Sequence, residues 1–300
     1  MLSGTIVFVL AAMLLITAAV LVKGPWWQRK CALLSAIAAA GVPWLTPADG
    51  PLLRGGVAVW TTWCLGRVID LVSEVHDRSF GARLWHVFGL VDTRQATFTA
   101  PGVDTTALGK TIFYAILAAI GLIVAIDMAA GTDGTWSWIV RWFGGALFFY
   151  SLADAVEGGV RTLYRAAGVI VPRQHVLPIA SRSVQESWGK RWNRAVGGWL
   201  RTHCFLPFAR RRQIRSGFVA AFCASAIFHA YFTWVAVGAG MALAMLVFFL
   251  MQGVFVLLEL RAGVAHWHLF FAHTWTVVAV LGCSPLFIEP FLQILVGALQ

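Results

Sequence analysis

Two stretches of the sequence contain the residue types that could perform chemistry. Residues 183–193 are polar, basic and aromatic at once, in a chain that is 59% hydrophobic and only 12% charged. Further along, His229 interrupts a long apolar run. An ionisable side chain in such a run is costly to bury, which indicates that it has a function.

His229 has the chemistry of a general base. Ser225, His229 and Thr233 recur at intervals of four residues, so on a helix they share one face. A neutral imidazole can take a proton from a hydroxyl group, and desolvation favours the neutral form. The alternative is a structural histidine that hydrogen-bonds to a neighbouring helix, and the apolar setting favours function over structure.

The polar stretch offers an amide and several cations. Asn193 could orient a substrate carbonyl group or donate to a developing oxyanion, although a helix cap or turn is the simpler interpretation of this residue alone. Lys190, Arg191 and Arg194 suit phosphate groups, and anchoring at a membrane interface explains them equally well.

The spacing in this stretch predicts one helix that reaches to about residue 201. Trp188, Trp192 and Trp199 would then share one face. Glu186 lies four residues before Lys190, the favourable order for an ion pair on a helix, and we expect that pair to be structural.

The composition excludes an ordinary soluble domain. Several apolar runs are long enough to cross a bilayer core of about 30 Å, which takes roughly 20 helical residues. We therefore predict an all-α polytopic integral membrane helical bundle of about eight transmembrane helices, with additional interfacial or re-entrant helices. A single integral membrane domain over residues 1–300 is the simplest division. The expected spans are 4–22, 31–45, 52–71, 111–130, 136–152, 216–237, 240–260 and 269–291.

The net charge of +10 is distributed as in membrane proteins. All Lys and Arg residues except Arg54 and Arg141 fall in segments on one side of the expected spans. The positive-inside rule places that side in the cytoplasm and the N-terminus outside. We therefore expect membrane lipids, and no nucleic acid, to be the partners of the basic residues.

Two connecting segments are amphipathic. Phe80, Leu84, Trp85, Phe88 and Val91 recur near helical spacing, with Arg83 and His86 on the opposite face, which predicts a helix lying in the membrane interface. Residues 153–170 form a second amphipathic segment after the fifth span.

No metal site or disulfide framework is expected. The five cysteines are scattered, without Cys-x-x-Cys spacing. His266, His268 and His273 have poor chelating geometry and no carboxylate or thiol close in sequence. Four further charged residues lie in or near spans, where pairing between helices or a role in lining a cavity would explain them: Arg54, Arg141, Asp127 and Glu259.

Residues 177–193 read Leu-Pro-Ile-Ala-Ser-Arg-Ser-Val-Gln-Glu-Ser-Trp-Gly-Lys-Arg-Trp-Asn and resemble the signature of wax synthase-like membrane-bound O-acyltransferases. That family places a Trp-Gly-x-Arg-Trp-Asn element before a membrane helix that carries its histidine. Ser225-Ala-Ile-Phe-His229 is similar to the histidine segment, at a similar distance. The resemblance covers residues 177–290, whereas about the first 150 residues match in hydropathy alone.

The resemblance implies a membrane-bound O-acyltransferase-like fold that transfers a fatty acyl group from acyl-CoA to a long-chain or other lipophilic alcohol. His229 would be the general base, and Asn193 would position the thioester or stabilise the developing charge. Acyl-CoA would be a co-substrate, with no separate cofactor. The implied substrate-binding residues are Trp188, Gly189, Lys190, Arg191, Trp192, Arg194, Ser225 and Thr233.

Two alternatives remain open. Ser187 and Ala230 stand where the family often has an aromatic and, in plant members, an acidic residue, so a sterol or natural product is an alternative acceptor. A transporter or channel for a lipophilic solute is the alternative of a different class, although the sequence has no visible inverted repeat. We expect a multi-pass protein of the cytoplasmic membrane in a bacterium or of the endoplasmic reticulum in a eukaryote.

Overall fold

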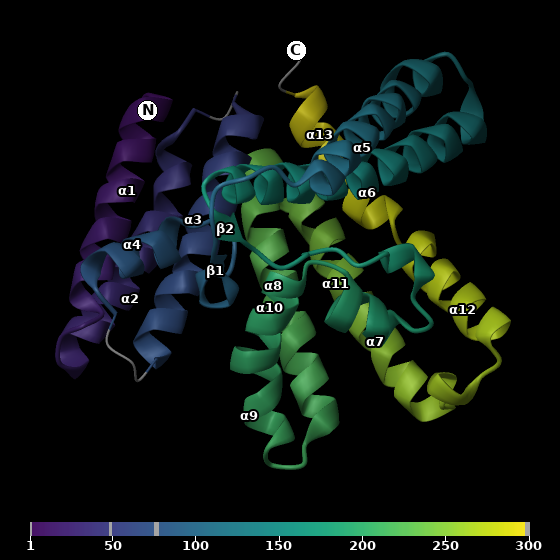
Figure 1. The fold of residues 1–300 in the computed structure, drawn as a ribbon. Coiled ribbons are helices and arrows are strands. Elements are labelled where there is room, and N and C mark those ends of the chain that lie inside the picture. The colour runs from purple at the N-terminus through teal and green to yellow at the C-terminus, as the bar shows by residue number, and fades with distance from the viewer. Residues whose placement is uncertain (1, 48–49, 75–77, 298–300) are drawn as a thin grey trace. The chain divides into compact units, whose positions relative to one another are not determined.

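A computed structural model describes residues 2–47, 50–74 and 78–297, and these residues are almost entirely helical (Figure 1). Within the described residues, two short strands pair antiparallel, β1 (Thr97–Phe98) and β2 (Val169–Ile170). The longer helices are α1 (Gly4–Leu21), α2 (Trp26–Gly41), α3 (Pro51–Ser73), α4 (Phe80–Phe88), α5 (Thr105–Ile123), α6 (Gly134–Ala166), α10 (Ile214–Val237), α11 (Ala239–Ala262), α12 (Leu269–Gly282) and α13 (Pro285–Val296). The shorter elements are η1 (Val42–Leu45), η2 (Thr93–Gln95), η3 (Val124–Met128), η4 (Pro178–Ala180), α7 (Val184–Glu186), η5 (Ser187–Arg191), α8 (Arg194–Leu200), η6 (Arg201–Phe205), α9 (Leu206–Ala209) and η7 (Val264–His266).

Helices long and apolar enough to cross a membrane are confirmed. Five of the described helices meet this description: α1, α5 together with η3, α6, α10 and α11. α12 and α13 form a sixth if they are one span bent by 41°. α2 has only 16 residues, and α3 carries Arg54, Arg67 and Asp70, so the predicted total of about eight spans stays a prediction.

The chain divides into two compact units. Unit 1 comprises Met1–Arg94, Phe228–Leu243 and Gln293–Gln300, and unit 2 comprises Gln95–Ile227 and Ala244–Leu292.

In unit 1, α1, α2, α3 and α4 lie side by side (Figure 1). Their shared core is built from small and branched side chains, including Leu15 on α1, Ala36 on α2 and Val68 on α3. Alanine at positions 32, 36 and 39 of α2 permits close approach of a neighbouring helix, as is common in membrane bundles. The Tyr231 hydroxyl donates to the Ala40 carbonyl and so ties the unit 1 part of α10 to α2.

In unit 2, α5 and α6 form a tightly packed antiparallel hairpin (Figure 1). A Cβ atom at Gly121 would lie 2.5 Å from the backbone nitrogen of Phe148, and one at Gly144 would lie 2.5 Å from that of Ala125. Only glycine permits this contact between helix backbones. α6 continues without a break to Ala166, so the expected span 136–152 and most of the amphipathic segment 153–170 form one helix.

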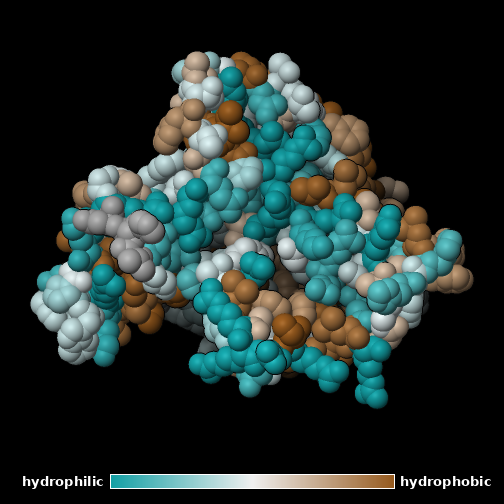
Figure 2. All heavy atoms as spheres, turned by 60° about the horizontal axis from the view of Figure 1, so that its bottom comes forward, coloured by the Kyte–Doolittle hydropathy of each residue, from teal (hydrophilic) through white to brown (hydrophobic). Residues whose placement is uncertain are grey.

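Large apolar side chains are exposed on the proposed spans. On α5, Ile112, Phe113, Ile116, Ile120 and Ile123 are all exposed. Figure 2 shows hydrophobic side chains reaching the surface on one face, next to hydrophilic ones. Apolar side chains in such positions suit a hydrocarbon environment.

α4 does not present its polar face to an aqueous interface. Arg83 and His86 are 8% and 0% exposed, whereas Phe80 is 44% exposed. Arg83 donates through Nη1 to the Val20 carbonyl at 3.2 Å, and His86 contacts Asp70. The predicted orientation is wrong because α1 and α3 supply buried partners for the polar side chains of α4.

Candidate functional site

The polar stretch folds into a segment of unit 2 that is helical only in parts. α7 runs into the π-turn η5, where the N–H of Trp192 donates to the carbonyl five residues earlier at 2.8 Å. Trp192 is extended, and Asn193 is left-handed (φ 38°, ψ 64°) before α8 begins. The predicted single helix with three tryptophans on one face is wrong, because helical geometry ends at Trp192.

The side-chain oxygen of Asn193 is occupied within the fold. Oδ1 accepts a hydrogen bond from the Val196 N–H at 3.3 Å, which makes Asn193 the N-cap of α8. Because an N–H group can only donate, the amide oxygen rather than the nitrogen must face Val196. Nδ2 has no hydrogen-bond partner among the described residues, so it is the part of this side chain that can donate to a ligand.

The loop before α7 is paired to the backbone around Asn193. The Arg194 N–H donates to the Gln174 carbonyl at 3.0 Å, and the Val176 N–H donates to the Arg191 carbonyl at 2.9 Å. The Gln174 side chain also accepts from the N–H of Ala195 at 2.8 Å. Residues 174–176 therefore lie against residues 191–195.

His175 occupies the middle of this pairing. Its ring centroid is 4.8 Å from the ring of Trp192, which in turn is 6.2 Å from the ring of Tyr150. Burial lowers the pKa of His175 to about 4, so the imidazole is uncharged at neutral pH. The sequence did not single out His175, because its relationship to Asn193 depends on backbone contacts that no spacing rule predicts.

Glu259 on α11 holds the start of the segment. Its carboxylate accepts from the N–H of Val184 at 2.6 Å and of Gln185 at 3.0 Å, and from Nε1 of Trp275 at 2.9 Å. Glu259 is only 4% exposed. A buried carboxylate is tolerated when several donors surround it, and these donors explain its presence in an apolar helix.

Two further polar contacts hold the segment. Gln252 lies seven residues before Glu259, so both fall on one face of α11. Its Oε1 accepts from Nε1 of Trp188 at 3.1 Å. On α12, Nδ1 of His273 lies 3.0 Å from the Ser181 carbonyl. α11 and α12 thus fix the segment from Ser181 to Trp188.

The cations of the segment divide into one paired residue and two exposed ones. Arg191 donates through Nε to Glu186 at 2.8 Å and through Nη1 to the Val176 carbonyl at 3.1 Å. The predicted pairing of Glu186 with Lys190 is replaced by this contact. Burial opposes the ionisation of Glu186, but the Arg182 N–H and the Arg191 guanidinium hold its pKa below the ordinary value.

Lys190 and Arg194 are exposed, as is Gly189 between Trp188 and Lys190. The Arg194 side chain donates through Nη1 to the Arg173 carbonyl at 3.3 Å. Arg173 is itself exposed. Lys190, Arg194 and Arg173 can therefore reach an anionic ligand near Asn193, whereas Arg191 braces the fold.

His229 lies on α10, with Thr233 one turn later. The Thr233 hydroxyl donates to the His229 carbonyl at 2.8 Å, a bond that the helix makes with its own backbone. The His229 ring is 5.4 Å from the ring of Phe232. Ser225 is buried one turn before His229, so the predicted helical spacing of these three residues is present.

The structure brings together only part of the predicted site. Ser225 and all the predicted residues from Trp188 to Arg194 belong to unit 2, whereas His229 and Thr233 belong to unit 1. The pairing of His229 with Asn193 stays a prediction.

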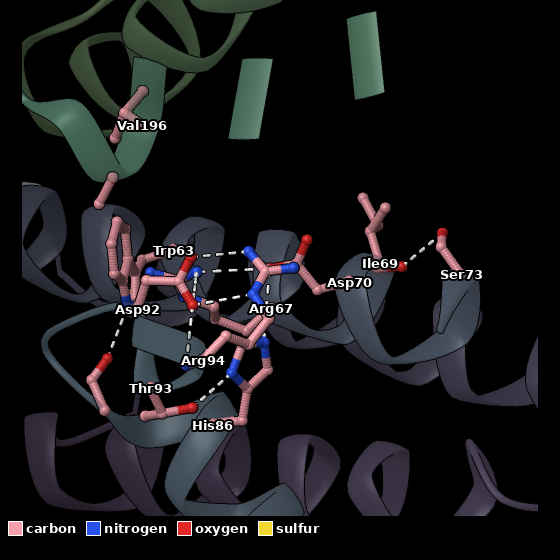
Figure 3. Close-up of polar contacts among 12 residues, drawn as sticks. Trp63, Arg67, Ile69, Asp70, Ser73, His86, Asp92, Thr93, Arg94 and Val196 are labelled. Atoms are coloured by element: carbon pink, nitrogen blue, oxygen red, sulfur yellow. Dashed lines mark hydrogen bonds and ion pairs between the residues drawn. The ribbon is translucent and has the colours of Figure 1, made fainter. Parts of the chain in front are cut away.

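A buried ionic cluster in unit 1 was missed by the sequence analysis (Figure 3). Arg67 lies 3.3 Å from Asp70 and 3.9 Å from Asp92, and Arg94 lies 3.1 Å from Asp70 and 2.8 Å from Asp92. Arg67 also stacks over the ring of Trp63 at 4.1 Å. The links from Arg67 to Asp92 and from Asp70 to Arg94 could not be predicted from the sequence, because α4 lies between the partners along the chain.

His86 and Thr93 complete the cluster. Nδ1 of His86 is 2.7 Å from the Thr93 hydroxyl, and Nε2 is 3.4 Å from Asp70 Oδ2. Figure 3 shows His86 and Thr93 joined beside the two arginines. Burial opposes the ionisation of Asp92, but hydrogen bonds and charge from Arg94 lower its pKa below the ordinary value. The cluster joins α3, α4 and η2 through complementary charges.

Two other charged residues of the expected spans, Arg141 and Arg54, lie against specific side chains. Arg141 pairs with Glu289 at 2.9 Å, and Arg54 lies 5.4 Å from the centre of the Trp44 ring. Asp127 is exposed within the π-turn η3. All five cysteines are free, and the described residues contain no group of three or more His, Cys, Asp or Glu side chains that could hold a metal ion.

Models of known protein families give no match to this chain, and no curated protein has significant sequence similarity to it.

Proposed function

We propose that the protein is a membrane O-acyltransferase that moves a fatty acyl group from acyl-CoA to the hydroxyl group of a long-chain or other lipophilic alcohol. The proposal rests on the resemblance of residues 177–193 and 225–229 to wax synthase-like enzymes. It also rests on the apolar helices, which suit lipophilic substrates.

The orientation of Asn193 is the observation that best supports this chemistry. Its oxygen caps α8, which leaves Nδ2 as a donor on a segment fixed by Glu259 and Gln252. A preorganised N–H donor stabilises the negative charge that develops on a thioester carbonyl during acyl transfer.

In the proposed reaction, the alcohol oxygen attacks the thioester carbonyl carbon and the carbon–sulfur bond breaks. His229 takes the proton from the hydroxyl group and returns it to the sulfur of the departing CoA. The products are an ester and free CoA. General base catalysis of this kind contributes roughly 10²- to 10⁴-fold to the rate.

Exposed cations give the segment a place for the phosphates of CoA. Lys190 and Arg194 are exposed and follow the part of the segment fixed by α11. Charge-assisted hydrogen bonds to phosphate need accessible donors, and both side chains provide them. Arg191 contributes indirectly, since its hydrogen bonds to Glu186 and Val176 keep this part of the chain folded.

A direct test is incubation of membranes containing the protein with labelled acyl-CoA and a panel of alcohols that includes long-chain, sterol and short-chain members. We expect a labelled ester with the long-chain alcohols, absent from membranes without the protein and from membranes with the His229→Ala variant. Ester formation with a sterol alone would identify a sterol, rather than a long-chain alcohol, as the acceptor. The absence of ester with every alcohol would refute the proposed function.

A further inference from the structure

His175 is an imidazole that the backbone of unit 2 brings against the ring of Trp192, the residue before Asn193. Its neighbours Gln174 and Val176 are hydrogen-bonded to Arg194 and Arg191, on either side of Trp192 and Asn193. Nδ1 of His175 is shielded from solvent and has no hydrogen-bond partner among the described residues. An unpaired buried nitrogen costs free energy, which a ligand that donates to it would remove.

We propose that Asn193 and His175 together bind an amide group of the pantetheine arm of acyl-CoA. In this arrangement one N–H of Asn193 Nδ2 donates to the amide carbonyl, and His175 Nδ1 accepts from the amide N–H. The second N–H of Nδ2 remains for the thioester carbonyl. The inference rests on the acyl-CoA-dependent function proposed above and assigns a further part of the same site.

The protonation state of His175 favours hydrogen bonding over proton transfer. Burial lowers its pKa to about 4, so the ring holds a proton too weakly to act as an efficient base toward an alcohol at neutral pH. A neutral imidazole still accepts a hydrogen bond through its unprotonated nitrogen. The ring is therefore suited to a donor that keeps its proton, and an amide N–H is such a donor.

The two side chains match a secondary amide because they provide one donor and one acceptor. Asn193 donates because its oxygen already faces Val196. Of the proposed substrates, acyl-CoA carries amide groups and a long-chain alcohol carries none. The rings of Trp192 and Tyr150 provide apolar surface for the methylene groups between the amides. His175 is only partly buried, so rotation about its χ2 bond can turn Nδ1 toward a ligand.

Binding of thioether probes to the purified full-length protein tests this assignment without any acyl transfer. S-octyl-CoA contains the pantetheine amides and the phosphates, whereas S-octyl-N-acetylcysteamine keeps an amide but has no phosphate. His175→Phe preserves a ring without nitrogen, and His175→Asn places an acceptor near the position of Nδ1. We expect His175→Phe to weaken both probes about fivefold, the effect of one hydrogen bond of about 1 kcal/mol, and His175→Asn to bind nearly as the parent does.

The matched control is the double variant Lys190→Gln, Arg194→Gln, which should weaken S-octyl-CoA and leave S-octyl-N-acetylcysteamine unchanged. Parent-like binding of both probes by a folded His175→Phe protein would overturn the assignment. If His175→Phe does not fold, His175→Gln replaces it, because its acceptor falls near Nε2 and should fail to restore binding. Failure of the parent protein to bind either probe would instead count against the acyl-CoA-dependent function itself.

Discussion

The carboxylate of Glu259 accepts a hydrogen bond from the backbone N–H of Val184 at 2.6 Å. The two residues are 75 positions apart in the sequence. Through this contact and those to Gln185 and Trp275, the apolar helix α11 fixes the start of the segment that leads to Asn193. A hydrogen-bond donor such as Asn193 Nδ2 can act in a site only if its backbone is held in place, and the hydrogen bonds to Glu259 contribute to this.

Glu259→Ala should loosen this segment. It leaves the N–H groups of Val184 and Gln185 and the indole of Trp275 without their acceptor. The buried N–H of Val184 alone should cost roughly 1–3 kcal/mol. Trypsin cleavage after the neighbouring exposed Arg182 measures how often this segment opens. Each 1.4 kcal/mol lost from the free energy of local opening should speed cleavage about tenfold. Glu289→Gln, which disturbs the Arg141 pair instead, is the control, and equal cleavage rates in the two variants would contradict the anchoring role.

Asn193→Asp should separate helix capping from catalysis. Aspartate caps helices as well as asparagine does and tolerates the left-handed conformation, so α8 and the stability of the protein should be preserved. The substitution removes the Nδ2 donor, and we expect kcat to fall about 10²- to 10³-fold. Thermal unfolding in detergent checks the fold and ester formation checks the reaction. Retained activity in a stable Asn193→Asp protein would show that the amide nitrogen is not used.

Lys190 and Arg194 should act on acyl-CoA binding, whereas Arg191 should act on stability. Neutralising Lys190 and Arg194 together should raise the KM for acyl-CoA more than it lowers kcat, because phosphate contacts are present in both ground and transition states. Higher salt should weaken acyl-CoA binding in the parent more than in the double variant. Arg191→Gln should lower the unfolding temperature, since it breaks the contact with Glu186. An unchanged KM and salt response in the double variant would argue for interfacial anchoring.

The ionic cluster of unit 1 should make stability depend on pH. The pKa of Asp92 is below its ordinary value of 3.8 in the folded chain, so its ionised form stabilises the fold above that value. That contribution is lost as the pH falls through the lowered value. Asp92→Asn should lower the unfolding temperature at pH 6. Between pH 6 and pH 3, the unfolding temperature of this variant should fall less than that of the parent protein. The exposed Asp133→Asn should behave as the parent does, and an identical pH dependence in all three proteins would exclude the contribution of Asp92.

The sequence predicted the helices better than the contacts between them. Hydropathy located the apolar helices because burial in a membrane depends on local composition, and α1, α5, α6, α10 and α11 are long and apolar enough to span. It assigned the wrong exposed face to α4, since Arg83 and His86 are buried by partners on α1 and α3.

Periodicity also failed at Trp192 and Asn193. Helical spacing of the tryptophans continues through the segment, but the chain leaves the helix there to pair with residues 174–176. The predicted interpretation of Asn193 as a cap is confirmed. The contributions of His175, Gln252 and Glu259 could not be predicted, because each depends on a partner far away in the sequence.

The stoichiometry of acyl transfer by the purified protein tests the central claim most directly. Labelled palmitoyl-CoA and hexadecanol should yield ester and free CoA in equal amounts, since one carbon–sulfur bond breaks for each ester bond formed. A correctly folded His229→Ala protein should lose the ester product, because the alcohol then has no base to accept its proton. Release of CoA without ester, or unchanged ester formation by His229→Ala, would contradict the account.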